Sequence, residues 1–365
     1  MRIVQVQTQA EAAGAQRVSD MVGAGLRARG HSVRTVFMYR KTDAYDADPY
    51  ADFVLQEAPA GAFGRMRAVA GLVRYLRAQK PETVITYQHY GNLFGTFAAR
   101  LAGVPRIVAN QSRQPQTKGV SGLISQVDKA MGTAGLYHAN IVNSAWNEAQ
   151  FAGFPSRYRA RLKRIDHGVE RADMLHDKAS ARERFDLPGN VPLAVTTGRL
   201  VAGKNQIALL GALRKEGDLH AAIAGVGPDR EGLEAFAREN GIAERVHFVG
   251  ELSPQEVRAF LAAGDLYVFA SRSESFGLSV VEAAIAGLPI VSSNLDVLRE
   301  VLTTDDGETA AIFAETNDAA GMAAAIARLR ADPALAARLS AAGRRLVERY
   351  APERMCAGYE ALLTP

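Results

Sequence analysis

Hydrophobic and polar positions along the 365-residue chain follow two alternating patterns. Short apolar runs are followed by longer stretches in which apolar residues recur every three or four positions. Short apolar runs are typical of parallel strands that are covered on both faces, and the longer spacing is typical of the amphipathic helices that cover them. The alternation therefore predicts an α/β fold with parallel sheets rather than a β-sandwich.

The predicted strands form two series. The first series is Ile3–Thr8, Val33–Tyr39, Thr83–Tyr87, Arg106–Asn110 and Asn140–Asn143. The second series is Leu193–Thr197, Ala221–Ala224, Val246–Val249, Leu266–Ala270 and Pro289–Ser292. Between them, residues 170–190 are polar and end in Leu-Pro-Gly-Asn, which predicts a linker. We therefore expect two domains, residues 1–170 and 171–350, each a doubly wound sheet.

The last part of the chain, Ala319 to Leu363, has a helical pattern that is interrupted at Tyr350-Ala351-Pro352. Because proline ends a helix, we expect residues 351–365 to return as a separate helix on the first domain. The predicted architecture is two facing Rossmann-like domains with a cleft between them. Ligands of such sheets bind beyond the carboxyl ends of the strands, so the residues that follow strands are the candidates for function.

The composition is ordinary for a globular protein, with 48% hydrophobic and 22% charged residues. No apolar run is long enough to span a membrane, and the first residues lack the apolar core of a signal peptide. Cys356 is the single cysteine, which excludes an internal disulfide and a cysteine-based zinc site. These features predict a cytoplasmic protein.

Charge is distributed unevenly along the chain. Residues 1–170 carry 22 basic and 12 acidic side chains, whereas residues 171–365 carry 21 basic and 27 acidic ones. A basic half predicts an anionic partner, and an anionic membrane surface is a candidate. Patterns typical of nucleic-acid readers are not evident, so we expect no nucleic acid among the partners.

Three polar or basic segments of the first half each allow two interpretations. Met66, Val69, Val73 and Leu76 recur at helical spacing among arginines, which fits either a membrane-surface helix or packing on the sheet. The five cations between Arg157 and Arg164 fit a binding surface or a solvated face. Asp46-Ala47-Asp48 resembles a metal-binding motif, but its polar surroundings favour a solvated loop, and we predict no metal.

Several loops after strands of the second series carry candidate ligand-binding residues. Gly198-Arg199 and Lys204 bring two cations into one loop, where they can neutralise a diphosphate or simply be solvated. Gly225-Val-Gly227-Pro228 lacks the third glycine of a dinucleotide fingerprint, so the glycines serve either a close nucleotide or a tight turn. Gly250 and Leu252 follow the third strand, where backbone groups can pair with a base.

The segment Ser271–Val291 joins a strand, a polar turn, a helix start and another strand. Glu274 lies in the turn and Glu282 lies eight residues further on, a spacing of about 12 Å along a helix. Two such carboxylates fit the ends of an elongated ligand, while unpaired helix N–H groups face its middle. That arrangement fits a nucleotide sugar. Either glutamate alone would more often be structural, but the Arg199/Lys204 loop favours the ligand interpretation.

In the first half, three residues follow predicted strands. Gly14 opens a helix and permits a backbone approach to an anion or a sugar. His89 follows the third strand and fits contact with a sugar or proton transfer, with a purely structural role as the alternative. Asn110 ends the next strand.

These motifs together resemble the retaining GT-B glycosyltransferases, the large family that includes bacterial mannosyl-, glucosyl- and galactosyltransferases of surface-polysaccharide assembly (family 4 type). The resemblance covers nearly the whole chain and is strongest from Val191 to Asn294. The motifs that carry it are Gly198-Arg199 with Lys204-Asn205, Gly225-x-Gly227-Pro228, Phe248-Val-Gly250, and Glu274-Ser-Phe-Gly-Leu-x-x-x-Glu282 followed by Gly287-x-Pro289.

The resemblance implies a role for each matching position. Arg199 and Lys204 would bind the donor diphosphate, Glu274 the sugar hydroxyls and Glu282 the ribose diol. With these, the expected donor-binding residues are Gly14, Gly198, Gly225, Gly227, Gly250, Leu252, Ser275, Phe276, Gly277 and Leu278. The expected catalytic residues are Glu274, Arg199 and Lys204, with His89 and Asn110 as further candidates.

The function that the resemblance implies is metal-independent transfer of a hexose, without any cofactor, from a UDP- or GDP-sugar to a saccharide or lipid-linked acceptor. Three features depart from the family pattern. Asn110 replaces a frequent histidine, and Asp166-His167-Gly168-Val169 stands for the usual Asn-Gly-Val, with the glycine kept and the asparagine lost. The glycine-rich loop near residue 14 is thinner than usual, with Ala13 before Gly14. The first departure leaves open a non-catalytic nucleotide-sugar-binding protein. A GT-B nucleotide-sugar epimerase is the third alternative.

Overall fold

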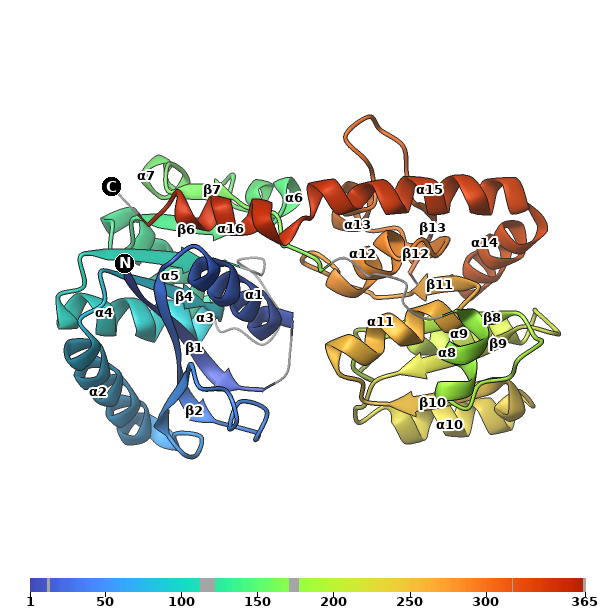
Figure 1. The fold of residues 1–365 in the computed structure, drawn as a ribbon, viewed down its shortest axis with the longest axis horizontal. Helices are drawn as coiled ribbons and strands as arrows, with labels where there is room; N and C mark the ends of the chain where they lie inside the picture. Colours follow the sequence, from blue (N-terminus) through green and yellow to red (C-terminus); the bar gives the residue numbers. More distant parts are fainter. Residues whose placement is uncertain (12–13, 112–121, 171–176, 317, 364–365) are drawn as a thin grey trace. The chain divides into compact units, whose positions relative to one another are not determined.

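The computed structural model describes residues 1–11, 14–111, 122–170, 177–316 and 318–363, and the chain divides into two compact units. Unit 1 comprises Met1–Gly168 together with Pro352–Pro365, and unit 2 comprises Val169–Ala351. Figure 1 shows that each unit is built on its own sheet with helices packed around it. The predicted α/β class with two doubly wound parallel sheets is confirmed.

The sheet of unit 1 has seven parallel strands in the order β3-β2-β1-β4-β5-β6-β7. They are β1 (Arg2–Ala10), β2 (Ser32–Arg40), β3 (Ala51–Leu55), β4 (Thr83–Tyr87), β5 (Arg106–Asn110), β6 (Ala139–Val142) and β7 (Leu162–Arg164). The helices are α1 (Gly14–Ala28), α2 (Gly61–Gln79), α3 (Gln88–Tyr90), the π-helical turn η1 (Gly91–Gly95), α4 (Thr96–Ala102), α5 (Gly122–Ala134), α6 (Ala145–Ala149), α7 (Ser156–Arg159) and α16 (Pro352–Glu360).

The sheet of unit 2 has six parallel strands in the order β10-β9-β8-β11-β12-β13. They are β8 (Leu193–Thr197), β9 (His220–Ala224), β10 (Val246–Gly250), β11 (Leu266–Phe269), β12 (Ile290–Ser293) and β13 (Ala311–Ala314). Its helices are α8 (Lys178–Arg184), α9 (Gln206–Leu213), α10 (Arg230–Glu239), the 3-10 turn η2 (Ala243–Arg245), α11 (Pro254–Ala263), α12 (Leu278–Ile285), α13 (Asp296–Val301), α14 (Ala319–Ala331) and α15 (Pro333–Arg349).

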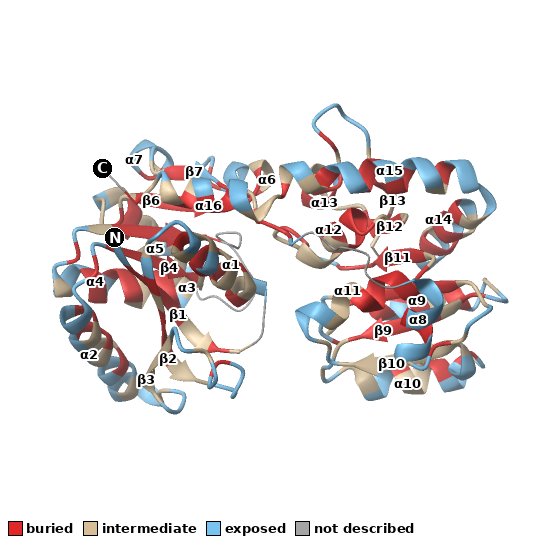
Figure 2. Ribbon diagram, viewed as in Figure 1, coloured by how far each residue is buried: buried red, intermediate tan, exposed pale blue. Residues whose placement is uncertain are grey.

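Each unit has its own hydrophobic core, formed where strands meet the apolar faces of the helices (Figure 2). In unit 2, Leu210 and Leu213 of α9 pack with Ile223 of β9 and Val268 of β11. In unit 1, α2 contributes several residues to the core, among them Leu72. This burial of apolar surface is the main stabilising term for each unit.

Part of the predicted linker is wrong. Residues 178–184 form α8, whose first turn is capped by the Asp177 carboxylate, which accepts from the N–H groups of Ala179 and Ser180 at 3.0 Å. Arg182 of α8 is buried and donates to the carbonyl oxygens of Ala263, Pro188, Gly189 and Val191. The polar residues of this segment therefore have structural roles: Asp177 caps a helix and Arg182 forms buried hydrogen bonds. They do not form the solvated linker that the sequence predicted.

The C-terminal helix α16 packs on unit 1, as its sequence break suggested. The Arg29 and His31 side chains contact the Glu360 carboxylate at 2.8 and 2.9 Å. Gly168 lies under the start of α16, and a Cβ atom there would meet Pro352 Cα at 2.9 Å. Gly168 belongs to the Asp166-His167-Gly168 motif, which differs from the family pattern but keeps its glycine. That glycine is therefore needed for this close packing.

Glycines hold two loops of unit 2 together at the carboxyl ends of β8 and β9. The N–H of Gly198 donates to Ala224 O at 2.9 Å, and the N–H of Leu200 donates to Val226 O at 2.9 Å. A Cβ atom on Gly225 would lie 2.0 Å from Gly198 O, and one on Gly227 would lie 2.2 Å from Leu200 O. The Gly-x-Gly pattern thus permits backbone-to-backbone packing between loops.

We expect Gly227→Ala to lower the free energy of unfolding by about 2–4 kcal/mol, because the methyl group meets a backbone carbonyl that cannot move away. Urea denaturation measures this change. Gly232→Ala is the control, since its Cβ meets no atom within 4 Å on the exposed side of α10, and it should be neutral or stabilising. Equal effects of the two substitutions would contradict the backbone-packing account.

In unit 1, the carboxylate of Asp128 accepts hydrogen bonds from two tyrosines, at 2.8 Å from Tyr158 Oη and at 3.4 Å from Tyr137 Oη. Burial raises the pKa of Asp128 from 3.8 to about 6, although both tyrosines oppose the shift. The folded protein therefore binds more protons than the unfolded chain between these two pH values. Its stability should fall as the pH rises through that range.

Asp128→Asn removes this cost of ionisation while keeping an oxygen that accepts from Tyr158. We expect the variant to be more stable than the parent by about 1–2 kcal/mol at pH 8, and to lose that advantage near pH 4. Thermal unfolding of both proteins across this range measures the difference. A gain that does not change with pH would show that the carboxylate charge is not its cause.

Candidate functional site

Lys204 and Glu274 meet at the carboxyl edge of the sheet of unit 2. Lys204 lies in the loop after β8 and Glu274 lies in the loop after β11, and Lys204 Nζ is 2.5 Å from Glu274 Oε1. The Glu274 side chain is 11% exposed and the Lys204 side chain 29% exposed. Two residues far apart in the chain, both predicted from sequence, thus form a half-buried ion pair in which each charge neutralises the other.

Asn205 fixes the loop that presents Lys204. Its Nδ2 donates to the carbonyl oxygens of Ala270 and Thr316, at 3.1 and 2.9 Å, and so connects the loops after β8, β11 and β13. Asn205 has a φ of 55°, in the left-handed region that asparagine tolerates. Its presence in the Lys204-Asn205 motif was visible in the sequence, but its positioning role was not predicted.

The two loops that carry Lys204 and Glu274 are also joined directly. The N–H of Arg272 donates to Gly203 O at 2.9 Å, and its guanidinium contacts Ala202 O at 3.4 Å. Arg199, the other predicted phosphate ligand, is exposed, and its carbonyl accepts from Gln206 Nε2 at 3.0 Å. Lys204 is therefore held in place, whereas the Arg199 head group projects toward solvent.

Helix α12 begins at Leu278, four residues after Glu274, with Gly277 as its N-cap. Gly277 has a φ of 87° and offers no side chain to cap the helix, so the first amides of α12 have no capping side-chain partner there. A positive partial charge accumulates at such a helix start and favours an anion. Ser275 and Leu278 flank this turn and are half-buried.

Phe276 and Glu282 have different surroundings. The Phe276 ring is buried and packs edge-on against Tyr350, with ring centroids 5.4 Å apart, so its side chain belongs to the core and only its backbone is available to a ligand. Glu282 lies half-buried on α12. Burial raises the pKa of Tyr267, with the nearby Glu282 charge as a smaller cause, and Tyr267 Oη contacts Thr197 Oγ1 at 2.9 Å.

Gly198, Gly225, Gly227 and Gly250 lie at the same sheet edge. The N–H of Gly225 donates to Gly250 O at 2.6 Å, so the three loops after β8, β9 and β10 are connected in series. Leu252 lines a polar cavity of about 660 Å³ together with Phe248 and residues of α8 and α11. The structure thus gives the glycines a role within the protein, while their donor-binding role stays a prediction.

The predicted residues of unit 1 lie at the carboxyl ends of its central strands. Gly14 begins α1, although residues 12–13 before it lie outside the described residues. His89 is half-buried on α3 after β4. Asn110 at the end of β5 is buried, and its Nδ2 donates to Tyr359 Oη of α16. Asn92 also bonds the Asn110 backbone, which gives Asn110 a structural role, while its catalytic role stays a prediction.

Two smaller expectations from the sequence can also be placed. Asp46 pairs with Arg40, and Asp48 Oδ1 accepts from the N–H of Tyr50 at 2.8 Å, within a turn segment of partly exposed residues. These aspartates are loop residues, as predicted. Within the described ranges, no cluster of three or more His, Cys, Asp or Glu side chains has a geometry that could hold a metal ion.

Comparisons with known proteins show the family to which the chain belongs. The model of the family described as glycosyl transferases group 1 matches residues 177–346, and the model of the glycosyl transferase 4-like domain matches residues 13–175. Together they cover nearly the whole chain. The chain therefore belongs to the group 1 (family 4) glycosyltransferases, which confirms the family predicted from its motifs.

Similar proteins include the lipopolysaccharide core biosynthesis glycosyltransferase LpsD of Rhizobium meliloti, 36% identical over 45% of this chain and 46% of the relative. A GDP-mannose-dependent alpha-(1-6)-phosphatidylinositol monomannoside mannosyltransferase of Mycolicibacterium smegmatis is 32% identical over 54% of this chain and 57% of the relative. The chain thus matches about half the length of each of these two relatives.

Solved structures with the same fold include sucrose-phosphate synthase from Thermosynechococcus elongatus, with a TM-score of 0.82, 21% identity and coverage of 99% of this chain and 98% of the other. HepE of Anabaena, solved in complex with UDP and glucose, has a TM-score of 0.85 at 17% identity, with coverage of 99% and 98%. These matches confirm the GT-B fold.

Asn205 offers a test of how the site is organised. We expect Asn205→Ala to lower the free energy of unfolding by about 2–3 kcal/mol, from two lost hydrogen bonds and a strained left-handed backbone. Asn205→Gly loses the same hydrogen bonds without the strain, so it should be less harmful. Urea denaturation compares the two variants. If glycine and alanine cost the same, the backbone conformation is not a constraint at this position.

Proposed function

We propose that this chain is a retaining glycosyltransferase that transfers a hexose from a UDP- or GDP-sugar to a saccharide or lipid-linked acceptor of surface-polysaccharide or glycoconjugate synthesis. The observation that carries this proposal is the half-buried Lys204–Glu274 pair beside the start of α12. Membership of the glycosyltransferase family supports the reaction class. The names of the relatives, which include lipopolysaccharide, O-antigen and phosphatidylinositol mannoside enzymes, support the acceptor class.

In this proposal the donor replaces the internal ion pair. Lys204 turns from the Glu274 carboxylate to the diphosphate, where the exposed Arg199 adds a second cation, and Glu274 accepts hydrogen bonds from the sugar hydroxyls. The first amides of α12, from Gly277 onward, face the sugar and phosphate. Glu282, deeper in the same helix, accepts from the ribose hydroxyls. Because Asn205 already fixes the loop that carries Lys204, only the Lys204 and Arg199 side chains have to move when the donor binds.

The proposed reaction exchanges one bond at the anomeric carbon for another on the same face of the sugar. The bond from this carbon to the diphosphate oxygen breaks, and the electron pair stays on the diphosphate. The acceptor hydroxyl oxygen forms the new bond, and its proton passes to the departing phosphate oxygen. Positive charge from Lys204 and Arg199 stabilises the leaving diphosphate, so the reaction as proposed uses neither a metal ion nor a cofactor.

We assign the acceptor to unit 1 and the donor to unit 2. Unit 1 offers the half-buried His89 after β4 and the helix start at Gly14, and His89 is the candidate for contact with the acceptor. No helix among the described residues is both long and apolar enough to cross a membrane. We place the enzyme in the cytoplasm, in peripheral contact with the inner face of the cell membrane through its basic unit 1.

Glu274→Ala tests the transfer reaction. With a UDP- or GDP-sugar and a saccharide acceptor, we expect acceptor-dependent release of nucleoside diphosphate that persists in EDTA and falls about 10²–10³-fold in the variant, which lacks a group that holds the donor sugar. Glu239→Ala, an exposed glutamate of α10, is the matched control and should keep full activity. Turnover without any acceptor would point to the epimerase, and tight donor binding without turnover to a non-catalytic protein.

The nucleotide and the sugar can be separated by binding alone. A donor that binds only the folded protein raises its melting temperature, so we expect a thermal-shift panel of nucleotide sugars to select either UDP or GDP. Lys204→Met should weaken binding of the free nucleoside diphosphate and of the complete donor alike, because both carry the diphosphate. Loss of binding for the complete donor only would contradict the assignment of Lys204 to the diphosphate.

A further inference from the structure

Unit 1 carries an ion pair at the carboxyl edge of its sheet, where the neighbouring strands β1 and β2 end. The register of these parallel strands places Gln9 beside Tyr39. One residue beyond each strand, Lys41 Nζ contacts the Glu11 carboxylate, with the Glu11 side chain 22% exposed and the Lys41 side chain 47% exposed. Parallel sheets bind their ligands at this edge, and both charges are open to one.

A chain of hydrogen bonds orients the Glu11 carboxylate. Tyr39 Oη donates to Gln9 Oε1, and Gln9 Nε2 donates to Glu11 Oε1. Lys41 contacts the other carboxylate oxygen, Oε2. Burial raises the pKa of Tyr39, so its phenol keeps the proton that the chain needs. Glu11 is therefore held in its orientation by groups other than Lys41.

Backbone contacts hold the two strand ends together. The N–H and the hydroxyl of Thr42 both donate to Ala10 O, at 3.0 and 3.2 Å. Gln16 of α1 donates from Nε2 to Gln9 O at 3.0 Å. The backbone around the ion pair is thus fixed, and the long Lys41 side chain is the part that can turn away.

The donor site of the proposed function is built from the same two residue types. Lys204 and Glu274 also follow neighbouring strands, β8 and β11, and also pair at the carboxyl edge of their sheet. An ion pair with exposed partners contributes little to stability. A ligand can therefore replace the contact between Lys41 and Glu11 at little cost.

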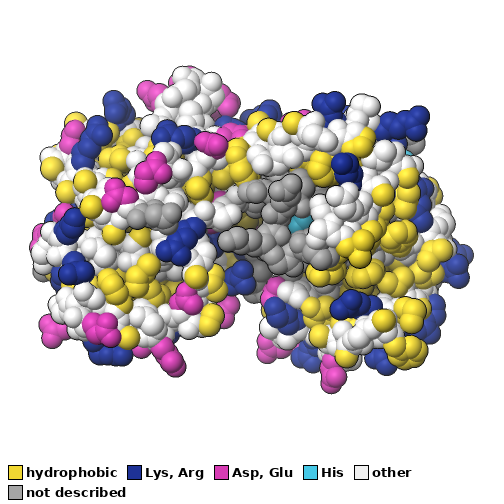
Figure 3. Space-filling view, turned by 180° about the vertical axis from the view of Figure 1, so that it is seen from behind, with side chains coloured by type: hydrophobic (Ala, Val, Ile, Leu, Met, Phe, Trp, Pro, Cys, Tyr) yellow, Lys and Arg dark blue, Asp and Glu magenta, His cyan; other side chains and the backbone are white. Residues whose placement is uncertain are grey.

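The Lys41–Glu11 pair is neutral, although unit 1 is basic. Residues 1–170 carry 22 basic and 12 acidic side chains, and the space-filling view of Figure 3 shows hydrophobic side chains with Lys and Arg among them on unit 1, in its right-hand half. The unit as a whole attracts an anion, but the Glu11 charge opposes one at this position. A carboxylate that accepts beside an ammonium that donates matches two neighbouring hydroxyl groups.

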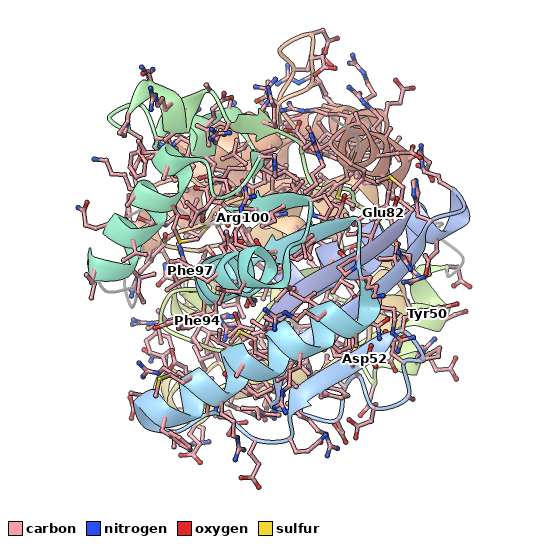
Figure 4. All side chains as sticks on the ribbon, turned by 90° about the vertical axis from the view of Figure 1, so that its left-hand side faces the viewer. Tyr50, Asp52, Glu82, Phe94, Phe97 and Arg100 are labelled. Atoms are coloured by element: carbon pink, nitrogen blue, oxygen red, sulfur yellow. The ribbon has the colours of Figure 1, made fainter. Side chains whose placement is uncertain are left out.

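An exposed aromatic ring lies after β4, the other neighbour of β1. Tyr90 is 41% exposed, and its ring lies 6.2 Å from that of Phe94 with the two planes 12° apart. Figure 4 shows Phe94 beside α2. The next residue, Gly91, lies against β1, because a Cβ atom there would meet Val6 O at 3.3 Å. Aromatic faces beside a few polar groups are typical of ligand sites, and the C–H face of a sugar ring packs on them.

We propose that Glu11 and Lys41 bind two neighbouring hydroxyl groups of a neutral acceptor sugar. Lys41 turns from the carboxylate and donates to one hydroxyl oxygen, while the other hydroxyl donates to Glu11 Oε2, so that both charges keep a partner. This inference rests on the proposed function, and it names the residues and the class of sugar that select the acceptor. No bond to carbon is made or broken here, so both are specificity-determining residues.

Binding of methyl glycosides tests the pair without the transfer reaction. Ligand-observed NMR titrations of the full chain with methyl mannoside, glucoside and galactoside should detect binding of at least one. For that sugar, deoxy analogues should identify two adjacent hydroxyl groups whose loss weakens binding about tenfold each, as expected for one hydrogen bond to a charged group. Lys41→Met should remove the dependence on one of these hydroxyl groups, and Glu11→Met the dependence on the other.

Asp46→Asn is the matched control. Asp46 pairs with Arg40 at the end of the same strand, and its substitution changes the net charge as Glu11→Met does. The control should bind glycosides as the parent protein does. Binding of no neutral glycoside by the folded chain, binding of a glucuronide or a sugar phosphate only, or an equal loss in Asp46→Asn would overturn the proposal.

Donor binding distinguishes this proposal from the proposed function. Thermal shifts with UDP- and GDP-sugars should be the same in the parent, Glu11→Met and Lys41→Met, because the donor is assigned to unit 2. Glycoside binding that depends on Glu11 and Lys41, without any transfer, would support this subsite and contradict the transferase. Transfer with an acceptor KM that neither substitution changes would overturn the subsite and leave the transferase in place.

Discussion

The site of unit 2 depends on how closely loop backbones approach one another at the carboxyl edge of its sheet. Gly225 and Gly227 lie against the carbonyl groups of Gly198 and Leu200, at distances that exclude any Cβ atom. The same loops exchange backbone hydrogen bonds. This contact fixes where the loop after β8 leaves the sheet, and therefore where Lys204 can stand relative to Glu274. The chemistry of the site rests on a steric constraint between peptide groups.

Much of this architecture was predictable from the sequence because buried parallel strands leave a strong apolar signal. β4, β5, β8 and β9 were predicted with bounds equal or nearly equal to those observed. β3, β7 and β13 were missed. β3 is only half-buried, only Leu162 of β7 is buried, and only the two end residues of β13 are buried. α8 was missed for a different reason. Its Arg182 points into the protein and donates to four backbone carbonyls, and the sequence alone does not distinguish a buried arginine from a solvated one.

The charged residues of the candidate site could be predicted from the sequence. The roles of its uncharged residues could not, because they depend on where their hydrogen-bond partners lie in the fold. Glu274 and Lys204 stand out as charged groups after strands, and the structure brings them together. Asn205 carries no charge, and its role depends on two carbonyl partners, Ala270 and Thr316, that are remote in sequence. Asn110 ends a strand like a site residue, and its amide donates to Tyr359 of the last helix, a contact between residues remote in sequence that the pattern did not predict.

The return of α16 to unit 1 sets an order on the assembly of the chain during synthesis. Tyr359, Cys356 and Met355 of α16 are buried in unit 1, so the core of that unit stays incomplete until these residues leave the ribosome. Unit 2 is continuous from Val169 to Ala351 and is available in full before then. Domains generally fold as they emerge, from the N-terminus onward. In this chain the second unit synthesised is the first that can finish folding.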